Sequence, residues 1–234
     1  MDKPKLIYCA DGHEQLARIA IETGYLYGTR LPKRGLHFPI YFADQDWKRP
    51  ARKAYMAALV EHRPAMATVL DWERAEQLAE VLDWAEEAAQ YVERVVIIPK
   101  VPGGIGKLPR RIGDRGVILG YSVPSRYGGT PLPLWSFAGW PVHLLGGSPH
   151  RQIEYWRYLV NIADVVSVDG NMHNLMATRY CQFWRPGDAR YASNRYWPTL
   201  REANGGINWA GKLDAPYEAF RRSCVNIREA WDAL

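Results

Sequence analysis

The chain has 234 residues, of which 47% are hydrophobic and 24% are charged, a balance that is typical of a folded protein and excludes bulk disorder. Its length suits one α/β barrel or two small domains, and either would bury a substantial core. A formal net charge of +5, from 30 Lys and Arg against 25 Asp and Glu, permits a nucleic-acid partner without requiring one.

Three predicted strands lie in the first third of the chain. The first is Lys5–Cys9, followed by a helix that Gly24 ends and by a loop at residues 28–35. The second strand, at residues 38–42, leads to Asp44 and Asp46. The third, at residues 65–70, delivers Asp71, and helical patterns at about 50–62 and 73–92 follow these two strands.

The fourth and fifth strands flank an unusual crossover. The fourth strand, at residues 94–98, is rich in β-branched residues and ends beside Lys100. Glycine and proline are frequent at residues 103–109, so the crossover is predicted to be mostly loop with one short helix. The fifth strand, at residues 116–119, ends at Gly120 and Tyr121.

The sixth and seventh strands form the best-marked unit. Strand Pro141–Leu145 leads through the turn Gly146-Gly147 into a helix, whose start is indicated by Ser148 as the N-cap. The following strand, at residues 164–168, delivers Asp169. This order is that of a parallel strand, helix, strand crossover.

Seven strands that alternate with helical patterns indicate a parallel sheet. We expect it to close into a (β/α)8 TIM-type barrel, one domain over residues 1–234, with an eighth strand at residues 176–184 or later. Residues 185–212 are polar and poorly periodic and are predicted to form a loop or lid. A closing helix is predicted at residues 214–234, whose apolar residues share one face: Tyr217, Phe220, Cys224, Ile227 and Trp231.

Cysteine usage and hydropathy indicate a cellular compartment. Cys9, Cys181 and Cys224 are scattered and odd in number, which favours a reducing compartment over a disulfide framework or a four-cysteine zinc site. The sequence shows no secretory signal and no apolar run of membrane-spanning length. We therefore expect a cytoplasmic protein without a membrane partner.

A barrel would gather the residues that follow its strands around one mouth. Asp44 (or Asp46), Asp71, Lys100 and Asp169 would meet there, and this set suits glycosidic chemistry. Cleavage at an anomeric carbon develops positive charge, which one carboxylate can trap covalently while a second handles the proton. Each aspartate taken singly is explained equally well as a turn or helix-cap residue.

Six segments, in this order, resemble the barrel of the tRNA-guanine transglycosylase superfamily: FADQD, TVLDW, VVIIPK, GVILGY, VHLLGGSP and DVVSVDGN. The similarity is greatest to the shorter bacteriophage relatives that exchange guanine for a 7-deazaguanine base in DNA. It implies the same exchange through a covalent aspartyl-sugar intermediate, without a cofactor. The protein would then act in the host cytoplasm if a phage encodes it.

The resemblance also implies roles for the residues that follow the strands. Asp169 matches the nucleophile, and Asp44 matches the acid/base aspartate, with Asp46 as the fallback. Asp71 matches an aspartate that hydrogen-bonds the base, and Lys100 stands where the family has a base-reading glutamine. Further base contacts are assigned to Gly120, Tyr121, Gly146 and Gly147.

Two departures from the family pattern are present. Gln45-Asp46-Trp47 replaces the serine and glycines that follow the first family aspartate. The zinc-binding cysteine cluster of the tRNA enzymes, and with it the tRNA-docking subdomain, is absent from this sequence. This absence favours a different nucleic acid, DNA rather than tRNA, or a different substrate altogether. No other metal site is predicted, because no carboxylate stands at ligand spacing from the histidines near the predicted mouth.

A target nucleotide would have to leave its stack, and basic and aromatic side chains usually hold it. The candidates for this surface are Arg126, Tyr127, Arg179, Arg185, Arg195 and Trp197. They are equally compatible with a solvated basic face that carries half-buried aromatic rings. The expected partners are nucleic acid and a 7-deazaguanine base, and a homodimer or a partner subunit stays open.

Two other functions remain open. The same aspartates, with the turn at residues 146–148 as a phosphate site, would suit a barrel hydrolase or lyase acting on a small nucleoside or phosphorylated substrate. The altered segment FADQD would suit a barrel that has lost catalysis and binds nucleic acid beside an active partner.

Overall fold

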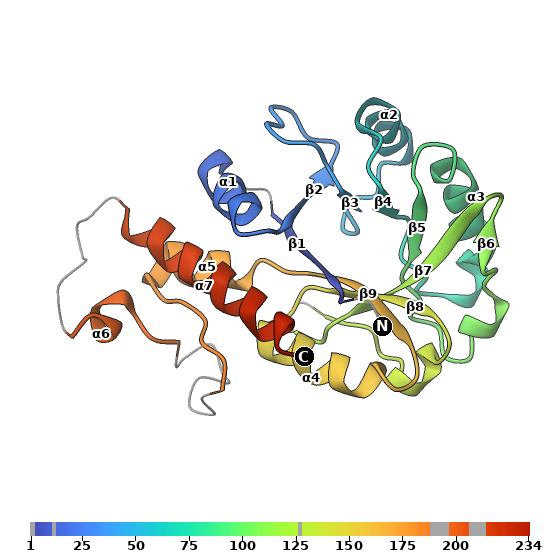
Figure 1. The fold of residues 1–234 in the computed structure, drawn as a ribbon. Coiled ribbons are helices and arrows are strands. Elements are labelled where there is room, and N and C mark those ends of the chain that lie inside the picture. Colours follow the sequence, from blue (N-terminus) through green and yellow to red (C-terminus); the bar gives the residue numbers. More distant parts are fainter. Residues whose placement is uncertain (1–2, 11–12, 126–127, 188–196, 206–213) are drawn as a thin grey trace.

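Eight parallel strands close into a barrel in the computed structural model, which describes residues 3–10, 13–125, 128–187, 197–205 and 214–234 (Figure 1). Around the barrel the strands follow one another as β1 (Lys5–Cys9), β2 (Leu26–Leu31), β3 (Phe42–Gln45), β4 (Met66–Thr68), β5 (Arg94–Ile97), β7 (Arg115–Ser122), β8 (Pro141–Leu145) and β9 (Asp164–Asp169). The pairing of β9 with β1 closes the ring, and β6 (Arg111–Ile112) forms an antiparallel hairpin with β7. The predicted (β/α)8 TIM-type barrel is confirmed.

Helices surround the barrel unevenly. The longer ones are α1 (Glu14–Glu22), α2 (Arg52–His62), α3 (Leu78–Ala88), α4 (Pro149–Leu159), α5 (Met172–Tyr180) and α7 (Ala215–Asp232). In the described residues, the crossovers on either side of β7 carry only η2 (Ile105–Lys107) and η3 (Leu134–Phe137); η1 (Ala75–Gln77) precedes α3 and α6 (Leu200–Ala203) precedes α7. Within the described ranges, no helix is both long and apolar enough to cross a membrane.

The last helix lies where the apolar pattern places it. Helix α7 packs against α5 and α1, and Figure 1 shows it running along the outside of the barrel beside them. Phe220, Cys224, Ile227 and Trp231 are buried on its inner face. Burial of this stripe contributes to stability through the area that it removes from water.

The barrel interior is filled with side chains. Ile7, Phe42, Met66, Val96 and Ile118 form a buried cluster of their own, separate from the larger core between strands and helices. The ring of His143 lies beside Phe42, with 4.8 Å between the ring centroids, so it also belongs to the interior. Because the interior is packed, a substrate site must lie at the mouth, where the strands end.

Two strand predictions are wrong. Residues 28–31, which were predicted to belong to a loop, are part of β2, and β2 is the strand that the prediction lacked. The eighth strand was predicted instead at residues 176–184 or later, but residues 176–180 belong to helix α5. Gly28 suggested a turn but serves close packing, since a Cβ there would lie 3.0 Å from Ile7 and 3.1 Å from the Phe42 carbonyl oxygen. The predicted strand at residues 38–42 is shifted as well, because β3 starts only at Phe42.

Candidate active site

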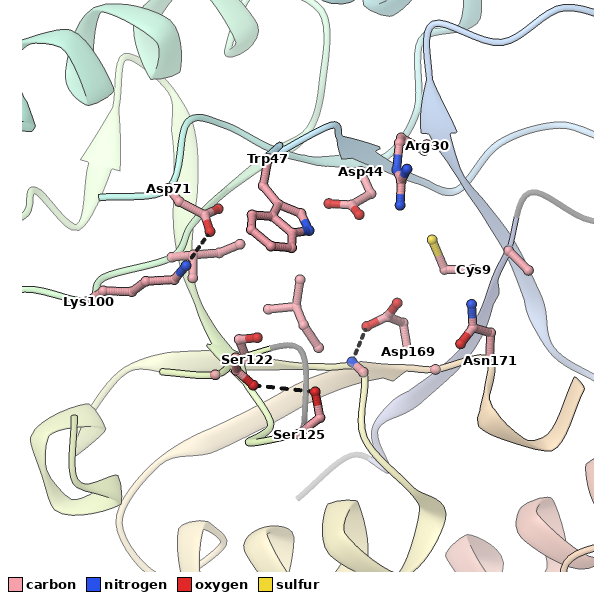
Figure 2. Close-up of a pocket in the computed structure, with 17 residues that line it drawn as sticks. Cys9, Arg30, Asp44, Trp47, Asp71, Lys100, Ser122, Ser125, Asp169 and Asn171 are labelled. Carbon is pink, nitrogen blue, oxygen red and sulfur yellow. Dashed lines mark hydrogen bonds and ion pairs between the residues drawn. The ribbon is translucent and has the colours of Figure 1, made fainter. Parts of the chain in front are cut away.

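A cavity of about 310 Å³ opens at the carboxyl ends of the strands (Figure 2). This is the lower end of the size range of small-molecule sites. Its polar and aromatic wall combines residues from around the whole barrel: Cys9, Arg30, Asp44, Trp47, Asp71, Lys100, Ser122, Asp169 and Asn171. The structure therefore brings together five of the predicted site residues, namely Asp44, Asp71, Lys100, Gly146 and Asp169.

Asp169, the last residue of β9, is held in a fixed orientation. Its Oδ1 accepts a hydrogen bond from the Gly146 N–H at 3.0 Å and lies 3.4 Å from Nε2 of His143. His143 is completely buried, and its Nδ1 lies 2.8 Å from the hydroxyl of Ser167. The carboxylate is thus supported from inside the barrel while it faces the cavity in Figure 2.

Asp44, in β3, faces the same cavity from the opposite wall (Figure 2). The Thr68 hydroxyl accepts a hydrogen bond from the Gln45 N–H at 2.9 Å, so its proton is free to be donated to Oδ1 of Asp44 at 3.0 Å. Burial, and then the negative charge of Asp169, raise the pKa of Asp44 to about 7, although Thr68 and Arg30 oppose the shift. The carboxyl group is therefore poised to gain and lose a proton near neutral pH.

Asp71 and Lys100 form a second polar group at the edge of the cavity. The Lys100 ammonium lies 2.8 Å from Asp71 Oδ2 and 2.8 Å from Glu73 Oε1. Burial raises the pKa of Asp71 in spite of the opposing lysine. For Lys100, burial acts to lower the pKa, but the two carboxylates outweigh it and the pKa is raised overall. Lys100 is therefore a permanent cation held by two acceptors.

Backbone pairing brings these two residues together. The Trp72 N–H donates to Ile98 O at 3.0 Å, and the Lys100 N–H donates to Trp72 O at 2.8 Å. The parallel pairing of β4 and β5 therefore continues beyond the strands, through a bridge between Trp72 and Pro99. Neighbouring strand ends thus set the spacing of Asp71 and Lys100.

Several cavity residues and supports were not predicted from the sequence, among them Trp47, Arg30 and His143. Trp47 projects its indole ring into the cavity between Asp44 and Asp71 (Figure 2), with the Lys100 ammonium 5.8 Å from the ring centroid. Arg30 also lines the wall, in register with Asp44 on the neighbouring strand. His143 is completely buried in the barrel interior, yet its Nε2 lies 3.4 Å from Asp169. The available signals were an aromatic residue three positions after Asp44 and an arginine at the end of β2, had that strand been recognised.

Several predicted base contacts lie outside the cavity. Tyr121 is a wrong prediction, because its ring packs against Phe137 and Tyr155 on the outer side of the barrel. Gly120 is enclosed in β7, where a Cβ would lie 2.7 Å from Ile98 and Leu145 side-chain atoms. Gly147 lies against Val123, whereas Gly146 does line the cavity. The fallback acid, Asp46, is also outside the cavity lining, and its Oδ1 accepts a hydrogen bond from the Lys48 N–H.

The predicted nucleic-acid surface is only partly described. Arg126, Tyr127 and Arg195 lie outside the described residues. Arg179 and Arg185 are exposed but do not line the cavity. Trp197 is a wrong prediction, because only 1% of it is exposed and it cannot stack on an extruded base.

The backbone groups of the glycine turn after β8 make hydrogen bonds within the protein. Gly146 donates its N–H to both the backbone oxygen and Oδ1 of Asp169, each at 3.0 Å. Ser148 caps α4 by accepting from Arg151 N, and Gln152 donates to the Gly146 carbonyl at 2.8 Å. The turn therefore positions Asp169. This role argues against the alternative that the turn at residues 146–148 binds a phosphate group. Within the described residues, no three histidine, cysteine, aspartate or glutamate side chains are grouped to hold a metal ion.

Comparisons with known proteins add a family but no activity. The family described as "Family of unknown function (DUF6610)" matches residues 20–232. No curated protein matches the chain. Among solved structures, the monomers of dimeric phosphoribosylanthranilate isomerase from Thermotoga maritima are similar to it, at 13% identity and a TM-score of 0.42, over 96% of this chain and 98% of that one.

Proposed function

The chain belongs to this family of unknown function, and we propose from its site that it is a base-exchanging glycosyl transferase. It would replace guanine in nucleic acid, with DNA favoured over tRNA, by a 7-deazaguanine derivative. The reaction would pass through a covalent intermediate between Asp169 and the sugar. The choice of bases and of DNA rests on the resemblance of the strand-end segments to the transglycosylases.

One observation carries the proposal: two aspartates in different environments face one cavity. Asp169 is oriented by the Gly146 N–H and lies beside His143, an arrangement that suits a nucleophile. The pKa of Asp44, about 7, lets it hold a proton and release it at neutral pH. Pairs of carboxyl groups whose environments separate their roles in this way are typical of glycosidic bond chemistry.

The exchange would proceed in two displacements. In the first, an Asp169 oxygen forms a bond to C1′ while the bond from C1′ to guanine breaks, and Asp44 gives its proton to the departing base. In the second, the ionised Asp44 takes the proton from the incoming deazapurine nitrogen. That nitrogen bonds to C1′, and the electron pair of the C1′–oxygen bond returns to Asp169. The enzyme ends in its starting state, and the sugar keeps its configuration.

Base recognition would fall to Trp47, Asp71 and Lys100. The exposed face of Trp47 offers a stacking surface, and base–aromatic stacking is worth about 1–3 kcal/mol per base. Asp71 can accept from the N–H groups of a guanine-like base, and Lys100 can donate to its carbonyl oxygen. Because the ammonium is shared by Asp71 and Glu73, donors and acceptors stand side by side, as a purine with both kinds of group requires.

The experiment is a base-exchange assay. The protein is incubated with tritium-labelled guanine together with a guanine-containing DNA oligonucleotide or, in a parallel reaction, together with tRNA. Transfer of label into the polymer, and its loss when unlabelled 7-deazaguanine is added, would support the proposal. Release of guanine without incorporation would instead indicate a hydrolase. Binding of the polymer with neither exchange nor release would indicate a non-catalytic subunit.

A further inference from the structure

Arg30 has no role in the two displacements or in base recognition, although it lines the same cavity. It lies near the end of β2, in register with Asp44 on β3, so the barrel itself sets its position at the mouth. Figure 2 shows its guanidinium directed into the cavity beside Asp44. This is the second cation of the wall, after Lys100.

The two cations differ in what surrounds them. Lys100 is engaged by Asp71 and Glu73, each at 2.8 Å. Among the residues that the structure describes, no carboxylate lies within ion-pair distance of the Arg30 guanidinium, which acts on Asp44 only through its longer-range charge. Asp44 itself is partly protonated at neutral pH and offsets this cation incompletely. Within the described part of the chain, the cation at one end of the cavity is therefore neutralised by carboxylates, whereas the cation at the other end has no carboxylate partner.

Asn171 lies near the same end. It precedes α5, but its side chain makes no capping hydrogen bond to the helix, and it lines the cavity. In Figure 2, Arg30 and Asn171 stand on one side of the pair Asp44 and Asp169, whereas Asp71 and Lys100 stand on the other. A guanidinium with an amide nearby is a donor set that suits the oxygens of a phosphate group.

We propose that Arg30, assisted by Asn171, binds a phosphate group of the target nucleotide. The inference rests on the proposed function, which places C1′ between Asp44 and Asp169. With the base toward Trp47 and Lys100, the rest of the sugar and its phosphate must extend to the Arg30 side. The chain would then act on a nucleotide and discriminate against the free nucleoside.

The test compares three ligands on Asp169→Asn protein, in which turnover is blocked. Deoxyguanosine and its 3′- and 5′-monophosphates are titrated by calorimetry at low ionic strength. At least one monophosphate is expected to bind roughly tenfold tighter than the nucleoside, as charge-assisted hydrogen bonds predict. Adding Arg30→Gln should reduce this advantage to less than about twofold while the affinity for deoxyguanosine is kept.

Arg34→Gln in the same background is the matched control, because it removes the same charge from an exposed arginine outside the cavity lining. It should keep the phosphate advantage, and thermal unfolding should show that both double variants are folded. Equal affinity for all three ligands, or an advantage that survives Arg30→Gln, would overturn the inference. Such a result would not contradict the proposed base-exchange activity of the wild type.

Failure of the proposed function has a different signature. If none of the three ligands binds, inorganic phosphate is titrated into the wild type and into Arg30→Gln, with chemical shifts as the readout. Phosphate binding that Arg30→Gln removes would support the anion site and reject a nucleoside substrate. Absence of phosphate binding to the wild type would reject the site as well.

Discussion

His143 supports Asp169 from within the barrel: its Nε2 lies 3.4 Å from Oδ1 of the aspartate, while its Nδ1 lies 2.8 Å from the Ser167 hydroxyl. A ring that carries its proton on Nε2 accepts a hydrogen bond from Ser167 through Nδ1 and places a polar N–H beside Asp169, although this second contact lacks hydrogen-bond geometry. His143 is therefore a positioning residue for the proposed nucleophile.

His143→Phe fills the space beside Phe42 but removes the polar N–H beside Asp169. We expect covalent-adduct formation to slow about fivefold, because the lost contact, at 3.4 Å and without hydrogen-bond geometry, is worth about 1 kcal/mol, less than a hydrogen bond to a charged group. Single-turnover kinetics would measure the rate, and urea unfolding would show whether the barrel is intact. His37→Phe, at an exposed histidine, is the control. An unchanged rate in a folded His143→Phe protein would exclude the positioning role.

Asp44 should set the pH dependence of the first displacement. Because its pKa is about 7 and the protonated form is required, single-turnover adduct formation should fall about tenfold per pH unit above pH 7. Asp44→Asn should react slowly and lose this dependence. Asp46→Asn should keep the wild-type profile, since Asp46 lies outside the cavity lining. A profile changed by Asp46→Asn and not by Asp44→Asn would reverse the assignment.

The same pKa shift predicts how stability changes with pH. Folding moves the pKa of Asp44 from 3.8 to about 7, so the folded chain binds more protons than the unfolded chain between these values. Its contribution to stability is therefore fully present below about pH 4 and is lost as pH rises to 7. At pH 8, Asp44→Asn should be more stable than the wild type, by a few kcal/mol at most. Urea unfolding at pH 4 and pH 8 would reveal the difference, and equal differences at both pH values would contradict it.

Trp47 should matter for binding and little for stability, because 45% of it is exposed and its ring faces the cavity. Trp47→Ala should weaken binding of guanine-containing single-stranded DNA by about 1–3 kcal/mol. Its free energy of unfolding should change by roughly 0.5 kcal/mol or less. Trp135→Ala is the matched control, at a tryptophan that is 66% exposed and outside the cavity lining. Fluorescence titration that shows equal losses in both variants would argue against stacking at Trp47.

The barrel was predictable because strand and helix patterns alternate, but β2 was not. Its sequence, LYGTRL, is short, and Gly28 with the prolines and glycine that follow suggests a turn. The glycine is instead required by close contact with Ile7 and Phe42, residues that are distant in sequence. Tertiary packing of this kind leaves no local signal. Arg30 was missed for the same reason, because an arginine in a supposed loop had no predicted position at the mouth.

The ends of the predicted strands identified the two aspartates that we propose to be catalytic, whereas the direction of side chains could not be predicted for the other residues. Asp44, Asp71, Lys100 and Asp169 converge because parallel strands deliver their carboxyl ends to one mouth. The prediction for Tyr121 is wrong because its side chain points to the outer face of β7, since adjacent residues in a strand point to opposite faces. The prediction for Trp197 is wrong because an aromatic residue beside arginine is as compatible with a core position as with a binding surface.

The most direct test of the central claim is a search for a covalent adduct. The protein is mixed with guanine-containing DNA, and in parallel with tRNA, and examined by denaturing gel and intact-mass measurement. We predict an adduct with DNA that corresponds to the protein plus the oligonucleotide less one guanine, and that is absent from Asp169→Asn. An adduct that persists in Asp169→Asn would place the nucleophile elsewhere. No adduct with either polymer, from a folded protein that binds it, would contradict the proposed mechanism.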